Sequence, residues 1–195
     1  MVGIPVIETS PMTVEEFYAF TDTRPDEEKW ELIGGEPILN AAPSSMHQWI
    51  VRNVILALGF RERQINKASW VVMPGPGVRI SDKDRPEPDV VVTPADQRIF
   101  DLRERDIKTV IVAFEVLSPS TKGRDLGWKR AAYAGLPPLT HYVAIAQDAV
   151  EVVVFARDKN FAEQRFKSLH EAVELRSLGV SLPVAEIYQG TSLAA

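Results

Sequence analysis

Two acidic residues stand in or beside apolar runs of this chain, and their positions suggest chemistry. Glu115 lies inside the β-branched and aromatic run 110–117, and Asp89 directly precedes the apolar run 90–92. An ionised carboxylate is very unfavourable in an apolar interior, so Glu115 needs a cationic side chain, a raised pKa or a metal ion. Both runs are typical of strands, and the two carboxylates could meet at one end of a sheet. This pattern suggests a divalent-metal site.

The ligands that the chain offers suit magnesium. There is no cysteine, which excludes thiolate metal sites and disulfides. Mg²⁺ prefers oxygen ligands and binds through one or two carboxylates, with water and phosphate oxygens completing its shell. The ion would polarise a phosphoryl oxygen and activate a water, and a lysine would stabilise the developing negative charge. Asp89, Glu115 and Lys129 have the side chains for these tasks, so we predict phosphodiester hydrolysis with Mg²⁺, for which Mn²⁺ can substitute.

One face of a predicted helix supports this interpretation. Asp125, Lys129 and Tyr133 are spaced i, i+4, i+8 and therefore line one side. We expect Lys129 to point at the end of the Glu115 strand, where it could stabilise a phosphate or orient a water. The alternative is an ordinary ion pair on a solvated helix surface, which would be worth only a few tenths of a kcal/mol.

Further candidates surround these residues. Glu31 could be a third acid of the site, or else an exposed hairpin residue. His47 stands near the start of a predicted helix, where it could support the site or be structural. A group of basic side chains near the proposed site could contact phosphate, the alternative being a solvated helix face; its members are Lys122, Arg124, Lys129 and Arg130.

The elements that must position these residues follow from hydrophobic periodicity and turn residues. Thr13 is expected to cap a first helix, and Ser44 or Ser45 a second one that ends near Gly59. Gly34 and Gly35 are expected to turn a hairpin. Strands are predicted at 70–73, 78–80, 89–92, 110–117, 142–146, 151–156 and 161–168, helical stretches at 97–103 and 122–134, and a closing turn or short helix at 182–188. This order predicts an α+β fold with a mixed sheet flanked by helices.

Length and charge limit the remaining possibilities. The 195 residues are expected to form one domain, with residues 1–10 as a loose arm. The formal net charge of −5 disfavours a general nucleic-acid coat protein but leaves room for a nuclease, whose metal supplies local positive charge. The chain shows no secretion signal and no membrane-spanning run, so a cytoplasmic location without a membrane partner is expected.

The motifs together resemble a known family. The blocks are Trp30-Glu31-Leu32-Ile33-Gly34-Gly35-Glu36, His47, Glu87-Pro88-Asp89-Val90, the run from Phe114 to Thr121, then Asp125, Lys129 and Tyr133, and Leu182-Pro183. In this order they resemble the bacterial Uma-two (Uma2) family of the PD-(D/E)XK nuclease superfamily. The resemblance implies a restriction-endonuclease-like fold, a magnesium site at Asp89 and Glu115, and a supporting acid at Glu31. It also implies that the superfamily lysine has moved to Lys129, because position 117 is leucine.

These observations leave more than one function open. The first is a magnesium-dependent endonuclease that acts on nucleic acid, with DNA as the expected substrate and a homodimer as a possible form. The second is a protein that keeps the nuclease fold but binds nucleic acid or a protein partner without turnover, as Leu117 and the negative charge suggest. The third is an α/β domain whose acids are purely structural.

Overall fold

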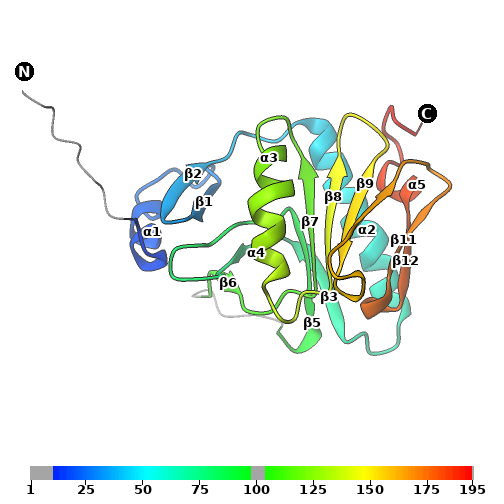
Figure 1. The fold of residues 1–195 in the computed structure, drawn as a ribbon, viewed down its shortest axis with the longest axis horizontal. Coiled ribbons are helices and arrows are strands. Elements are labelled where there is room, and N and C mark those ends of the chain that lie inside the picture. Colours follow the sequence, from blue (N-terminus) through cyan, green and yellow to red (C-terminus); the bar gives the residue numbers. More distant parts are fainter. Residues whose placement is uncertain (1–10, 98–103, 195) are drawn as a thin grey trace, which may run out of the picture.

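A mixed six-stranded sheet forms the centre of the molecule (Figure 1). The structure is a computed structural model that describes residues 11–97 and 104–194. The strands follow the order β10-β9-β8-β7-β5-β3, and within this sheet β7 and β8 run parallel while the other neighbours are antiparallel. Their bounds are β3 Trp70–Pro74, β5 Val90–Pro94, β7 Val112–Leu117, β8 His141–Ala146, β9 Val152–Ala156 and β10 Glu163–Phe166. The predicted α+β fold with a central mixed sheet is confirmed.

Helices cover both faces of this sheet (Figure 1). One face packs against α2 (Ser45–Gln64) and α5 (Val184–Ile187), in a core that includes Ile50, Phe114 and Ile145. The other face packs against a helix that runs as α3 (Lys122–Arg124), a π-helical turn η2 (Asp125–Lys129) and α4 (Arg130–Ala134). Because alternate strand residues point to opposite faces, position 115 shares the second face with Ala113 and Leu117.

The smaller elements surround the sheet. A helix and a hairpin pack together beside it, namely α1 (Val14–Thr21), β1 (Trp30–Ile33) and β2 (Glu36–Leu39). Two further strand pairs are β4 (Gly77–Val78) with β6 (Asp106–Ile107) and β11 (Ala172–Leu175) with β12 (Val180–Pro183). The 3₁₀ turns are η1 Ala95–Gln97, η3 Arg157–Lys159 and η4 Arg176–Leu178.

Local sequence signals explain how several elements begin. Thr13 and Glu16 form the predicted capping box of α1, and the Ser44 hydroxyl caps α2 by accepting from the His47 backbone N–H. Gly34 and Gly35 turn the β1–β2 hairpin with φ of 60° and 80°, in the left-handed region that favours glycine. These starts and this turn agree with the sequence predictions.

The end of the second helix and the pairing partner of β3 differ from the predictions. Helix α2 continues past Gly59 to Gln64, because its apolar contacts with the sheet outweigh the roughly 1 kcal/mol that an internal glycine costs. Residues 78–80 are not the return strand of β3: β3 pairs with β5, and β4 pairs with β6. The β3–β5 pairing extends the central sheet next to the fully buried run Val90–Val92, whereas an isolated hairpin would be marginal in water.

The predicted loose arm at residues 1–10 and the 98–103 part of the predicted helical stretch lie outside the described residues. Within the part of the chain that the structure describes, no helix is both long and apolar enough to cross a lipid bilayer.

Candidate active site

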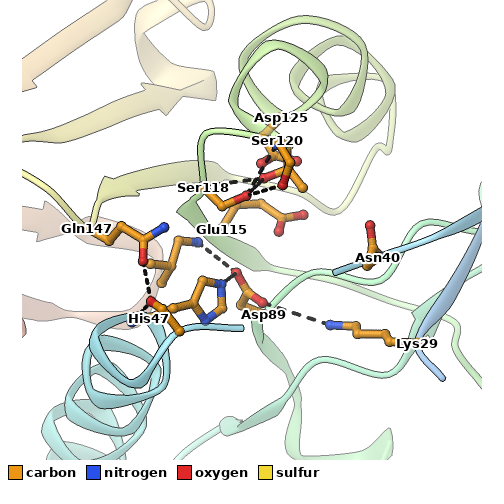
Figure 2. Close-up of polar contacts among 12 residues, drawn as sticks. Lys29, Asn40, His47, Asp89, Glu115, Ser118, Ser120, Asp125 and Gln147 are labelled. Atoms are coloured by element: carbon orange, nitrogen blue, oxygen red, sulfur yellow. Dashed lines mark hydrogen bonds and ion pairs between the residues drawn. The ribbon is translucent and has the colours of Figure 1, made fainter. Parts of the chain in front are cut away.

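Asp89 and Glu115 approach each other on neighbouring antiparallel strands. The last register pair of β5 and β7 at this end is Val90 opposite Phe114, and one position further along come Asp89 and Glu115. The Asp89 backbone N–H donates to the Phe114 carbonyl over 3.0 Å, and Asp89 Oδ2 accepts from the Val116 N–H over 2.8 Å. Figure 2 shows both carboxyl groups at the centre of the site. The predicted meeting of two acids remote in the chain is therefore present.

Both carboxylates line one cavity of about 430 Å³ at this end of the sheet. Its walls come from the loop before β1, the segment 40–44, the start of α2, the turn 118–121 and the η2 turn. Polar side chains from these segments and from the loop after β8 also line it; among them are Lys29, Asn40, Ser44, Ser118, Ser120 and Gln147. The cavity thus combines two strand carboxylates with hydrogen-bonding groups from several loops.

Lys129 is the cation that pairs with Glu115. Its Nζ lies 2.9 Å from Glu115 Oε1, 2.7 Å from Glu31 Oε1 and 3.5 Å from Asp125 Oδ1. Burial would lower the pKa of Lys129, but the carboxylates of Glu115, Glu31 and Asp125 raise it above its ordinary range. The lysine is therefore a fixed positive charge, and its side chain is only 3% exposed.

The negative charge of Glu115 is only partly offset by neighbouring cations. Burial raises the pKa of Glu115 well above its ordinary value, and Lys129 opposes this rise. The carboxylates of Asp89, Asp125 and Glu31 raise it further. One ammonium is shared among several acids here, so a cation placed beside Glu115 would favour its ionised form.

Glu31 anchors the cluster from β1 and is fully buried. Besides Lys129, its carboxylate accepts from the Glu87 backbone N–H over 2.7 Å and pairs with Arg124 at 3.0 Å. Burial alone would raise the pKa of Glu31, but Lys129, the Glu87 N–H and Arg124 outweigh burial and lower it. The exposed-hairpin alternative is wrong for Glu31. Its Oε1 contacts both Lys129 and the Glu87 N–H, and its Oε2 faces Arg124 without a hydrogen bond, an arrangement suited to supporting Lys129.

The helix face predicted from i, i+4 spacing is buried rather than solvated. Asp125 and Lys129 lie in the π-helical turn and are 2% and 3% exposed, so the alternative of a surface ion pair is wrong. Burial raises the pKa of Asp125, with Lys129 opposing it. Tyr133 is fully buried and stacks on Tyr142, with 5.5 Å between ring centroids, so it belongs to the core behind the cavity.

Asp89 is held by groups from two other segments (Figure 2). His47 Nε2, near the start of α2, lies 3.1 Å from Asp89 Oδ2, and Lys29 Nζ lies 3.9 Å from Asp89 Oδ1. Burial would raise the pKa of Asp89, but His47, Lys29 and the Val116 N–H lower it. Asp89 is therefore ionised near neutral pH. His47 contacts the site as the sequence suggested, whereas sequence reasoning missed Lys29.

Only two of the four basic residues of the predicted phosphate-binding group, Arg124 and Lys129, line the cavity. Lys129 is buried among carboxylates, and Arg124 contacts Glu31 and donates to Asn40 Oδ1 over 2.6 Å. Arg130 lies over the Phe155 ring, 5.2 Å from its centroid, and neither it nor Lys122 belongs to the cavity walls. The helix turns these side chains in different directions, so residues close in sequence do not form one patch.

The donor set fits a hard cation held by two carboxylates. Within residues 11–97 and 104–194, no group of three or more His, Cys, Asp or Glu side chains is arranged to hold a metal ion. Mg²⁺ needs only one or two carboxylates, with water and phosphate oxygens in its other positions. The residues that could hold it are Asp89 and Glu115. Asp89 is ionised, and the negative charge of Glu115 is only partly offset by Lys129.

Comparison with known proteins shows which family the chain belongs to. A profile of the Uma2 family, described as "putative restriction endonuclease", matches residues 14–185. This protein belongs to the Uma2 family. Its fold is similar to a crystal structure described as a putative nuclease from Anabaena variabilis, with a TM-score of 0.73 and 17% identity over 91% of this chain and 97% of that one. At this identity, the likeness concerns the fold alone.

A protein of Synechocystis sp., described only as uncharacterized, is 33% identical over 109 residues. This match spans 53% of the chain described here and 54% of its relative, so it covers about half of each.

In the protein described here, Leu117 packs in the core with Tyr133. The amine that contacts Glu115 comes from Lys129 on the following helix.

Proposed function

We propose that this protein is a magnesium-dependent endonuclease that hydrolyses phosphodiester bonds of nucleic acid, with DNA as its substrate. The observation that supports this most is the pair Asp89 and Glu115, which neighbouring strands present to one cavity above a buried lysine. Membership of a family described as putative restriction endonucleases agrees with this chemistry. Fold alone would not establish the reaction, so the proposal rests on the site.

Each residue of the site would have a distinct role in hydrolysis. Asp89 and Glu115 would hold Mg²⁺, which supplies Lewis-acid polarisation of the phosphate and a more acidic water. In the reaction, a water oxygen bonds to phosphorus and releases a proton to solvent, the bond from phosphorus to the leaving sugar oxygen breaks, and that oxygen takes up a proton from solvent. Lys129 keeps Glu115 in place and offsets part of its negative charge, and Glu31 fixes Lys129. His47 fixes Asp89.

A homodimer is part of the proposal, because cleavage of both strands in one complex needs two copies of the site. Helix α2 offers a surface for such contact. Trp49, Leu56 and Phe60 recur on its outer side and are 44%, 53% and 62% exposed. Sedimentation equilibrium of the full chain tests this: a dimer is expected, and Leu56→Glu should shift it to monomer. A wild-type monomer at all concentrations would contradict this part.

Cleavage assays test the activity itself. The purified chain is incubated with supercoiled plasmid DNA, single-stranded DNA and RNA, each with Mg²⁺, Mn²⁺ or EDTA. We expect metal-dependent cleavage of DNA by the wild type and none with EDTA. A wild type that binds DNA but cleaves no substrate with either metal would instead support the binding protein without turnover.

A further inference from the structure

The two lysines of the site differ in what their ammonium groups can still do. Lys129 Nζ lies within 3.5 Å of three carboxylates, those of Glu31, Glu115 and Asp125, and its side chain is 3% exposed. Its Nζ donates to Glu115 Oε1 over 2.9 Å and lies 2.7 Å from Glu31 Oε1, whereas Asp125 Oδ1, at 3.5 Å, is an ion-pair contact without a hydrogen bond. Lys129 is therefore engaged with the carboxylates around it and exposes little of its side chain to a ligand that enters the cavity.

Lys29 presents the opposite situation. Its side chain is 42% exposed and lines the same cavity, and its Nζ lies 3.9 Å from Asp89 Oδ1. That distance is beyond a hydrogen bond, so the contact is electrostatic and leaves the donors of Lys29 to solvent or to a ligand. Its backbone is fixed, because the Lys29 carbonyl accepts from the Asn40 N–H over 2.9 Å.

The position of Lys29 relative to Asp89 matches what a phosphate needs. Oxygens of a phosphodiester bound at a metal on Asp89 would lie within a few ångströms of that carboxylate. An ammonium at this side of Asp89, on a flexible four-carbon stem, can donate to a non-bridging oxygen of the same phosphate. Figure 2 shows Lys29 approaching Asp89 from the side away from His47, so the two residues do not compete.

We infer that Lys29 is the residue that binds the substrate phosphate, and that Lys129 is a positioning residue that acts through Glu115 and Glu31. This inference rests on the proposed nuclease function and names the phosphate-binding group within it. It replaces the sequence-based expectation that Lys129 itself reaches the phosphate.

Kinetics and binding test this with four proteins: wild type, Lys29→Ala, Lys29→Arg and the control Lys167→Ala. Lys167 is a more exposed lysine, at 67%, that follows β10, pairs with Glu151 at 3.2 Å and is outside the cavity walls. Cleavage of a labelled DNA duplex with Mg²⁺ gives KM and kcat. Fluorescence anisotropy of the same duplex without Mg²⁺, over a range of salt concentrations, gives the number of phosphate contacts.

Lys29→Ala is expected to raise KM about tenfold, as for loss of one charge-assisted hydrogen bond, and to change kcat much less. The slope of log affinity against log salt should fall by about 1, because one phosphate contact is lost. Lys29→Arg should retain the wild-type slope, and Lys167→Ala should match wild type in both measurements.

The results distinguish a failure of the Lys29 assignment from a failure of the nuclease proposal. A wild type that binds and cleaves DNA, together with a Lys29→Ala variant of unchanged KM and salt slope, overturns the assignment of Lys29 and leaves the nuclease proposal intact. A wild type that neither binds nor cleaves DNA overturns both.

Discussion

Two buried cations of this protein are surrounded by carboxylates, yet their surroundings differ in one respect. Arg85 donates to Glu87 over 2.6 Å, to Asp106 over 2.7 Å and to the Arg105 carbonyl over 3.0 Å. Its five donors serve two acids, so each carboxylate accepts a hydrogen bond, although one positive charge faces two negative ones. Lys129 has three donors for three acids, and a fourth carboxylate, that of Asp89, lies close enough to raise the pKa of Glu115.

The difference shows how a structural charge cluster can be told from a functional one. Both clusters are buried and both contain ion pairs, so burial and pairing alone do not separate them. The supply of donors does. Both acids at Arg85 accept a hydrogen bond from the guanidinium, whereas a cation beside Glu115 and Asp89 would offset negative charge that raises the pKa of Glu115.

The largest expected effect comes from removing each cation. Lys129→Met and Arg85→Met should each lower the free energy of unfolding by about 3–5 kcal/mol, because each leaves buried carboxylates unpaired. Mg²⁺ should restore part of the loss in Lys129→Met and none in Arg85→Met, since only the first site can bind the ion. Urea unfolding with and without Mg²⁺ measures this. Equal restoration in both variants would erase the proposed difference between the clusters.

Neutralising the acids tests the same comparison through activity. Asp89→Asn and Glu115→Gln should each lower kcat for DNA cleavage by about 100-fold or more, because each removes a charge that holds the metal. Asp106→Asn, in the Arg85 cluster, is the matched control and should keep wild-type kcat per folded molecule. Circular dichroism gives the folded fraction. If Asp106→Asn loses activity as strongly as Asp89→Asn, the Arg85 cluster belongs to the active site.

Much of the site could be predicted from the sequence because its signals are local. Glu115 interrupts an apolar run, so its need for a partner is visible without coordinates. Asp89 directly precedes another such run, and the Ser44 cap places His47 at the start of α2. The shared helix face of Asp125 and Lys129 follows from helical spacing, although that spacing could not tell whether the face is buried or exposed.

Other features depend on long-range pairing, which local patterns do not encode. Lys29 lies in a polar connection with no periodicity, and only the position of β1 relative to β5 brings it to Asp89. The partner of β3 was missed for the same reason, since its sequence fits a hairpin and a sheet strand equally. Strand β11 was missed too: its four residues alternate weakly in burial and depend on pairing with β12.

Metal addition should produce a smaller effect on the wild type. Binding to the native state alone stabilises it by about 2.7 kcal/mol when Mg²⁺ is at 100 times its dissociation constant. Thermal unfolding with Mg²⁺ and with EDTA measures the shift in Tm. Asp89→Asn should show little or no shift. A shift of wild-type size in Asp89→Asn would place the ion elsewhere.

The smallest expected effect concerns pH and lies outside both clusters. Burial lowers the pKa of His141 below its ordinary value of 6.5, with Asp158 opposing this and Arg176 adding to it. The unfolded chain therefore binds the proton more readily, so this contribution to stability is present above pH 6.5 and is lost as the pH falls below it.

Thermal unfolding between neutral and mildly acidic pH checks this expectation, with His141→Gln as the comparison. That variant should have a flatter dependence of Tm on pH, and Lys167→Ala, which is outside the cavity walls, should keep the wild-type dependence over this range. An unchanged curve in His141→Gln would assign the acid sensitivity to other groups.

The direction of the Lys129 side chain depends on the exact length of the π-helical turn from Asp125 to Lys129. Each residue of an α-helix advances the side-chain direction by about 100°. Shortening the turn by a single amino acid would therefore swing Lys129 out of reach of Glu115 and Glu31, even though a regular helix of good composition remained. Natural variants and engineered chimaeras of this fold should tolerate exchanges of residues here far better than changes of length.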